Sequence, residues 1–107
     1  MILSIKPNRC LTEEDFKAVA QLPIYLEMLQ NRVCIRIPHS TNTAVTASMT
    51  HYVVEQWLIE NAMGLFHVKT QHDTGGGRRI DIYLAIAEDG VNIKIRMDGT
   101  DLRQWSR

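Results

Sequence analysis

The fold is decided by residues 65–98, which read LFHVKTQHDTGGGRRIDIYLAIAEDGVNIKIRMD. The second half of this stretch centres on Asp89-Gly90, a dipeptide typical of two-residue type I′ turns, which need positive φ at both central positions. Apolar and polar residues alternate on both sides of it, as in strands with one buried face. A turn there places Leu84 opposite Ile95, apolar against apolar. The sequence therefore predicts a β-hairpin, preceded by a third antiparallel strand at residues 65–71.

The alternate residues of these strands are expected to form a second, polar face of the sheet. Its candidate ligand-binding residues are aromatic and cationic: His67, Lys69, Tyr83, Lys94 and Arg96. Sheet surfaces of this kind bind single-stranded RNA or phosphorylated ligands, because bases stack on aromatic rings and cations meet phosphates. A single tyrosine is fewer than such surfaces usually carry, so an ordinary solvated face is the simpler interpretation.

Helix and strand signals precede this stretch. Thr12-Glu13-Glu14-Asp15 resembles a capping box, with Asp in place of the usual Glu or Gln, and predicts a helix start. Pro23 predicts a second short helix ending near Asn31, and Val33–Ile37 alternates as a strand. The longest helix is expected from about Thr46 to Met63, with Gly64 at its C-terminal cap.

Together these elements predict one α+β domain over residues 1–107. The sheet is expected to be mainly antiparallel, with about four to five strands, including a short edge strand at Ile2–Lys6. One long helix and one or two shorter helices are expected to pack on one face of this sheet. The length suits a single domain, and a hydrophobic content of 45% is enough for a core.

A polar loop is expected between two of the strands, from Gln71 to Arg79. Its candidates for binding an anion or another ligand are His72, Asp73, Gly76, Arg78 and Arg79. Glycine N–H groups and two guanidiniums are donors that suit phosphate or carboxylate. The loop leads into a strand, unlike a phosphate-binding P-loop, so a flexible connection is the alternative interpretation.

The histidines and cysteines indicate neither a metal site nor a cofactor, since none of their spacings matches a known ligand set. His51 and Glu55, four residues apart in the long helix, are expected to form a surface pair. Cys10 and Cys34 are expected to be free thiols in a reducing compartment. The expected location is cytoplasmic, because no apolar run approaches the roughly 18 residues of a membrane span and Lys6-Pro7 interrupts any leader.

The composition disfavours a nucleic-acid-binding protein, because twelve Lys and Arg balance twelve Asp and Glu to a net charge of zero. The leading hypothesis is a small binding or interaction module that acts as a homodimer, with a protein or a small anionic ligand as a further partner. Self-association is expected at the edge of the strand ending at Asp98 or around Trp105. Two alternatives stay open: a small enzyme acting on an anionic substrate, and an RNA- or DNA-associated protein that uses the polar sheet face.

Overall fold

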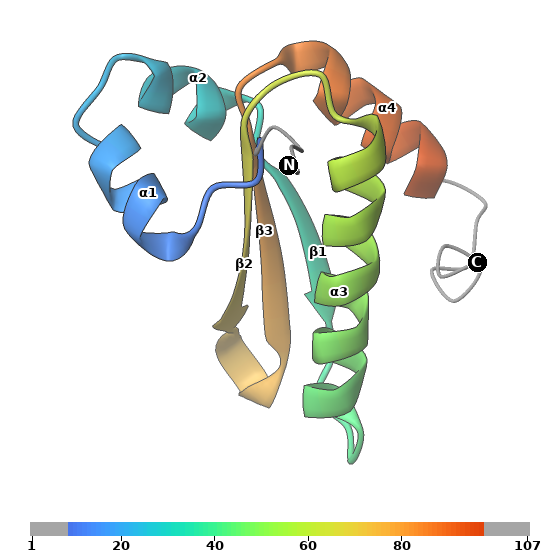
Figure 1. Ribbon diagram of the computed structural model, residues 1–107. Helices are drawn as coiled ribbons and strands as arrows, with labels where there is room; N and C mark the ends of the chain where they lie inside the picture. The colour runs from blue at the N-terminus through green and yellow to red at the C-terminus, as the bar shows by residue number, and fades with distance from the viewer. Residues whose placement is uncertain (1–8, 98–107) are drawn as a thin grey trace, which may run out of the picture.

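The computed structural model of the protein describes residues 9–97 (Figure 1). Along the chain the elements are α1 (Glu13–Val19), α2 (Ile24–Gln30), β1 (Val33–Ile37), α3 (Thr43–Asn61), β2 (Phe66–His72), the 3-10 helix η1 (Thr74–Gly76), β3 (Arg78–Leu84) and α4 (Ala87–Met97). The predicted α+β class and antiparallel sheet are confirmed. Within the described range the sheet has three strands, not four to five. The strand predicted at Ile2–Lys6 lies outside the described residues.

β3 is the central strand of the sheet. The strand order is β1-β3-β2, and both pairings are antiparallel. Ile82 stands opposite Val33 of β1 and Val68 of β2, so three branched apolar side chains form one row across the sheet. Ile80, Ile82 and Leu84 have no exposed surface, which makes their face of β3 the floor of the main core.

Helices cover both faces of this sheet (Figure 1). α3 and α4 pack on the face of Ile82, where Val54 and Ile93 join the core. α1 and α2 cover part of the opposite face, where Phe16 and Met28 surround Tyr83. The prediction that the helices lie on one face is therefore wrong. The alternating residues of β3 include an aromatic on the second face, and that ring needs an apolar cover of its own.

The first two helices start at the predicted signals. The N–H of Asp15 donates to the Thr12 hydroxyl at 3.1 Å and the N–H of Thr12 donates to the Asp15 carboxylate at 3.4 Å, which confirms the capping box. α2 follows Pro23 and ends at Asn31, as expected. α3 begins three residues before Thr46, because the buried Thr43 hydroxyl bonds the backbone of the preceding loop.

The connection between β2 and β3 is shorter than the predicted Gln71–Arg79 loop. The strands extend to His72 and from Arg78, which leaves five residues to make the turn. Gly75 and Gly76 adopt φ angles of 76° and 87°, the left-handed region that side chains avoid. The glycines therefore serve a tight connection between paired strands.

The hairpin predicted across Asp89-Gly90 is wrong. Residues 87–97 form α4, and Leu84 pairs with Phe66 of β2 instead of Ile95. The apolar residues that alternate in the sequence lie on different sides of the helix: Ile93 is fully buried, whereas Ile95 is 65% exposed. The predicted strand ending at Asp98 does not exist within the described residues, and Asp98 and Trp105 lie outside them.

A contact distant in sequence accounts for this difference. The side chain of Asp89 is buried, and its carboxylate accepts hydrogen bonds from the N–H of Met63, at 3.0 and 3.1 Å, and of Gly64, at 3.0 Å. These donors follow the end of α3, whose C-cap is Ala62 and not the predicted Gly64. Asp89 thus joins the first turn of α4 to the connection between α3 and β2.

Substitutions of Asp89 distinguish helix α4 from the hairpin turn that the sequence predicted at this position. Asp89→Ala should lower the free energy of unfolding by about 2–3 kcal/mol, because two partly buried backbone donors lose their charged acceptor. Asp89→Asn should cost about half as much, since one amide oxygen still accepts. In a type I′ turn asparagine would be favoured at this position. Urea unfolding followed by circular dichroism measures both variants, and an asparagine variant as stable as the wild type would contradict α4.

Tyr83 tests the cover that α1 and α2 provide. Because Tyr83 is only 8% exposed and packs on Phe16, Tyr83→Ala should cost about 3–5 kcal/mol of unfolding free energy. Leu84→Ala, on the other face of the same strand, is the matched comparison and should cost about 2–5 kcal/mol. A Tyr83 variant that loses far less stability than the Leu84 variant would show that this face is solvated.

Candidate functional site

The half of the polar sheet face beneath α1 is closed. His67 and Tyr83 are cross-strand neighbours there, and both are buried. The ring of Phe16 stacks on His67 at a centroid distance of 4.5 Å and lies 4.7 Å from Tyr83. His67 Nδ1 lies 2.8 Å from the Leu11 carbonyl oxygen. These two predicted sheet-face residues are thus engaged within the fold.

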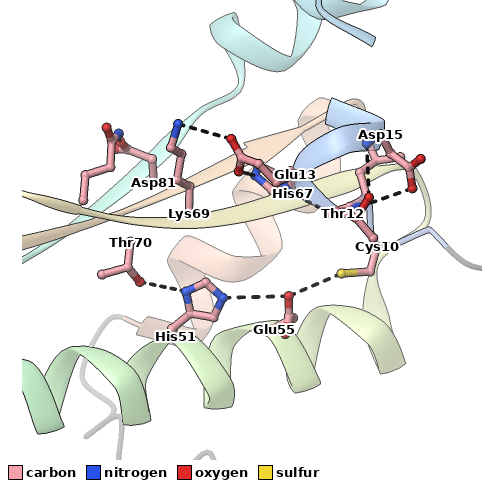
Figure 2. Close-up of polar contacts among 12 residues, drawn as sticks. Cys10, Thr12, Glu13, Asp15, His51, Glu55, His67, Lys69, Thr70 and Asp81 are labelled. Atoms are coloured by element: carbon pink, nitrogen blue, oxygen red, sulfur yellow. Dashed lines mark hydrogen bonds and ion pairs between the residues drawn. The ribbon is translucent and has the colours of Figure 1, made fainter. Parts of the chain in front are cut away.

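Glu13 fastens α1 to this face (Figure 2). Its carboxylate lies 3.2 Å from His67 Nε2 and 3.6 Å from Lys69 Nζ. Although desolvation opposes the charge, Lys69 and His67 lower the pKa of Glu13. The carboxylate therefore stays ionised at neutral pH, and Lys69, the third predicted residue of this face, has an acidic partner.

The other half of the face is open and electrically balanced. Its cations are paired at 3.0 Å for Arg79–Asp81 and 3.2 Å for Arg36–Asp73. Asp81 has no exposed surface and also accepts a hydrogen bond from Gln71. The hydrogen bond and the charge of Asp81 raise the pKa of Arg79. A ligand that approached Arg79 would have to compete with this buried carboxylate.

The two arginines predicted to bind an anion lie on opposite faces of the sheet, because successive side chains of a strand alternate. Arg79 lies on the polar face with Asp81. Arg78 stands opposite His72 on the other face, and its Nη1 lies 3.5 Å from the Gly76 carbonyl oxygen. The predicted group is therefore divided between two surfaces.

Asp73 and Gly76, from the same predicted group, shape the turn after β2. Asp73 accepts a hydrogen bond from the Thr74 N–H at 2.9 Å and so caps η1. The Gly76 carbonyl lies 3.3 Å from His39 Nδ1, and a Cβ at this glycine would meet the His39 ring at 3.0 Å. Both residues hold the connection between the strands in shape.

Lys94 and Arg96 lie in the last turn of α4 and not on the sheet. The predicted sheet-face group is thus reduced to the three residues that β2 and β3 carry. Its two other members followed from the hairpin register, which the helix replaces.

On the opposite side of β2, four polar side chains form a chain of contacts (Figure 2). Glu55 Oε2 lies 3.4 Å from Cys10 Sγ and 3.8 Å from His51 Nε2. His51 Nδ1 lies 2.7 Å from Thr70 Oγ1. The predicted His51–Glu55 pair is confirmed. Cys10 and Thr70 were missed as partners, since no sequence spacing indicates that three separate segments meet here.

These contacts leave Cys10 unreactive. Burial, the charge of Glu55 and the hydrogen bond to it raise the pKa of Cys10 to about 12. At neutral pH the thiol is protonated and donates to Glu55, whereas nucleophilic attack needs a thiolate. The arrangement links the segment before α1 to α3, and it lacks the activation that a catalytic cysteine requires.

The start of β2 is paired on its outer side. The Phe66 N–H donates to the Arg9 carbonyl at 2.9 Å, and the Phe66 carbonyl accepts from the Leu11 N–H at 2.8 Å. Cys10 and Phe66 form a parallel bridge between these bonds. The pairing goes no further because Thr12 turns the chain into α1.

Beyond Phe66 the outer edge of β2 is open. Residues of an antiparallel strand alternate between facing their partner and facing away from it. Since Phe66 bonds outward, the backbone groups of Val68, Thr70 and His72 also face outward, away from β3. Within residues 9–97 no backbone group pairs with these three. This edge is the largest set of unused hydrogen-bonding groups that the sheet offers.

Comparisons with protein-family models, with curated proteins and with solved structures found no match to this chain. None of the helices in residues 9–97 is both long enough and apolar enough to cross a membrane. In the same range no three His, Cys, Asp or Glu side chains are grouped so as to hold a metal ion.

The link between Cys10 and Glu55 can be tested by alkylation. In a Cys34→Ser background, Glu55→Gln should speed the reaction of Cys10 with iodoacetamide at pH 8, because removal of the negative charge lowers the thiol pKa. Below that pKa, each unit of lowering raises the thiolate fraction about tenfold. Glu60→Gln, at an exposed position of the same helix, is the control and should leave the rate unchanged. Equal rates in the two variants would contradict the contact.

Proposed function

We propose that the protein is an interaction module that binds an extended strand along the free edge of β2. The observation that carries this proposal is the row of outward-facing backbone groups at Val68, Thr70 and His72. A strand laid beside them would find donors and acceptors at the spacing of a sheet. Exposed strand edges recognise peptides in this way.

Two walls flank the edge and would supply selectivity (Figure 2). α3 forms one wall, with His51 and Glu55 beside the strand. Lys69 and Glu13 form the other, on the polar face. An extended partner would direct alternate side chains toward each wall, while its main chain supplies most of the affinity. The polar walls favour partners with polar or small side chains.

The edge of β1 is a poorer template. By the same alternation only Cys34 and Arg36 face outward there, because Val33, Ile35 and Ile37 bond toward β3. Pro38 follows directly, and proline and charge both discourage strand pairing at an edge. The proposal is therefore placed on β2.

The other two hypotheses from the sequence have less support. An enzyme for anionic substrates would use Arg78 and Arg79 together, yet they lie on opposite faces. An RNA- or DNA-associated sheet would offer Tyr83 for stacking, yet its ring is buried. We keep the cytoplasm as the expected location, because free Cys10 and Cys34 suit a reducing compartment.

Removal of one outward donor tests the proposal. Random heptapeptides displayed on phage would be selected on the wild-type protein at about 1 µM and then measured against two variants. Thr70→Pro removes the outward N–H and places a ring across the edge, so binding should fall at least about tenfold. Thr70→Val keeps the N–H and the branched shape while losing the hydroxyl contact to His51, and it should bind as the wild type does.

Three outcomes of this binding experiment would contradict the proposal. Peptides that bind Thr70→Pro as well as the wild type would place the site elsewhere, provided that circular dichroism shows the variant folded. A selection that yields no peptide binding above background would also count against strand recognition. Equal losses in Thr70→Pro and Thr70→Val would assign the effect to the Thr70 hydroxyl instead of the backbone.

A further inference from the structure

We infer that the strand which fills this edge is β2 of a second copy of the chain, so that two sheets join into one across a two-fold axis at Thr70. The inference rests on the proposed strand-binding edge and names its occupant. Thr70 is the middle of the three outward-facing residues, and a two-fold axis through it makes both copies use the same groups.

The register that follows is self-complementary. With Thr70 opposite its own copy, Val68 stands opposite His72, and Lys69 stands opposite Gln71 on the polar face. No like charges meet, and a threonine pair at the centre is a favourable cross-strand contact. The edge is neutral along its length because Lys69 already has Glu13 as its partner.

The same operation brings the two α3 helices together. α3 lies over β2 and β3 and runs alongside β2 in the opposite direction (Figure 1). Neighbouring strands lie about 4.8 Å apart, so the two-fold axis lies half that distance from β2 on one side and the middle of the β2–β3 gap lies half that distance on the other. A helix above this gap is therefore about 5 Å from the two-fold axis. The helix axes of the two α3 copies would be roughly 10 Å apart. Packed helices lie 8–10 Å apart, so both layers would close at once.

The side of α3 that faces the axis is suited to this contact. His51 and Glu55 lie on that side, because they reach Thr70 and Cys10 at the edge of β2. Helical spacing places Ala44 and Ser48 in the same row. Both are exposed and small, so they allow a close approach.

The position of the axis sets which helix residues meet. His51 lies over Thr70, so the antiparallel pair of α3 helices is centred close to His51. A residue that precedes His51 in one copy therefore approaches a residue about equally far after His51 in the second copy. Ser48 of one copy then lies beside Glu55 of the second copy, a hydroxyl donor beside a carboxylate. Residues 43–61 carry no Lys or Arg, so no pair of lysines or arginines faces across the axis, and the two His51 side chains lie closest to it.

The size of the contact sets the expected strength. α3 is about 28 Å long at 1.5 Å per residue, and a strand layer with a helix above it is about 15 Å high, which gives roughly 400 Å² of flat area per copy. Specific interfaces bury about 600 Å² or more per partner. We therefore expect a weak, concentration-dependent dimer and not a permanent one.

Two substitutions of opposite charge at Ser48 test this arrangement. Sedimentation velocity of the full chain from about 5 to about 500 µM should show a monomer–dimer equilibrium. Ser48→Glu sets a second carboxylate beside Glu55 of the other copy and should weaken the dimer at least about tenfold, whereas Ser48→Lys should keep or strengthen it. Both variants should melt as the wild type does at low concentration, since Ser48 is exposed.

Disulfide trapping tests the register. In a Cys10→Ser, Cys34→Ser background, Thr70→Cys should cross-link two copies, because the paired Cα atoms would be about 5.5 Å apart, within disulfide range. His72→Cys in the same background is the control. Its copies would be offset by four residues, about 13 Å along the strands, and should not cross-link.

The outcomes separate this inference from the proposed function. A monomer at every concentration overturns the dimer, while peptide binding blocked by Thr70→Pro would leave the strand-binding edge standing. A dimer that Ser48→Glu and Ser48→Lys weaken alike, or leave alike unchanged, overturns the arrangement. Cross-linking through His72→Cys but not Thr70→Cys overturns the register.

Discussion

The pairing of β3 on both sides is the interaction on which the rest of the structure depends. Ile80, Ile82 and Leu84 are fully buried because β1 and β2 flank their strand and α3 and α4 cover it. The same pairing fixes which backbone groups of the outer strands face away from the sheet. A slip of β2 by one residue would turn Lys69 into the core. The open edge is thus a consequence of the register that builds the core.

The elements that local chemistry controls were predictable from the sequence. The capping box at Thr12, the helix restart at Pro23 and the strand at Val33–Ile37 all depend on neighbouring residues. The hairpin prediction was wrong because Asp89-Gly90 suits either a turn or a helix. The residues that bind the Asp89 carboxylate in the helix, Met63 and Gly64, are more than twenty residues away in the sequence. The β-branched residues that follow fit a strand locally, yet β3 already pairs on both sides.

The candidate site shows the same limit. The His51–Glu55 contact follows from helical spacing alone, whereas Cys10 and Thr70 reach it only through the pairing of β2 and the packing of α3. The separation of Arg78 from Arg79 depends on where β3 begins, because adjacent residues share a surface in a loop and oppose each other in a strand. Errors in the strand boundaries therefore became errors in the predicted site.

Asp81 affects both the register of β2 against β3 and the charge beside the free edge of β2. A buried carboxylate is costly, and here Arg79 and Gln71 offset that cost. Because Gln71 belongs to β2, its hydrogen bond to Asp81 depends on the register of the two strands, whereas Arg79 lies on the same strand as Asp81. Arg79 is held by Asp81 and Lys69 by Glu13, so these two cations of the polar face are paired with acids, in a chain whose charges sum to zero. The strand partner that we propose would then be selected by backbone geometry at short range and not by long-range attraction. A neutral edge further differs from a charged one in that it does not repel its own copy, which is the condition a two-fold strand pairing requires.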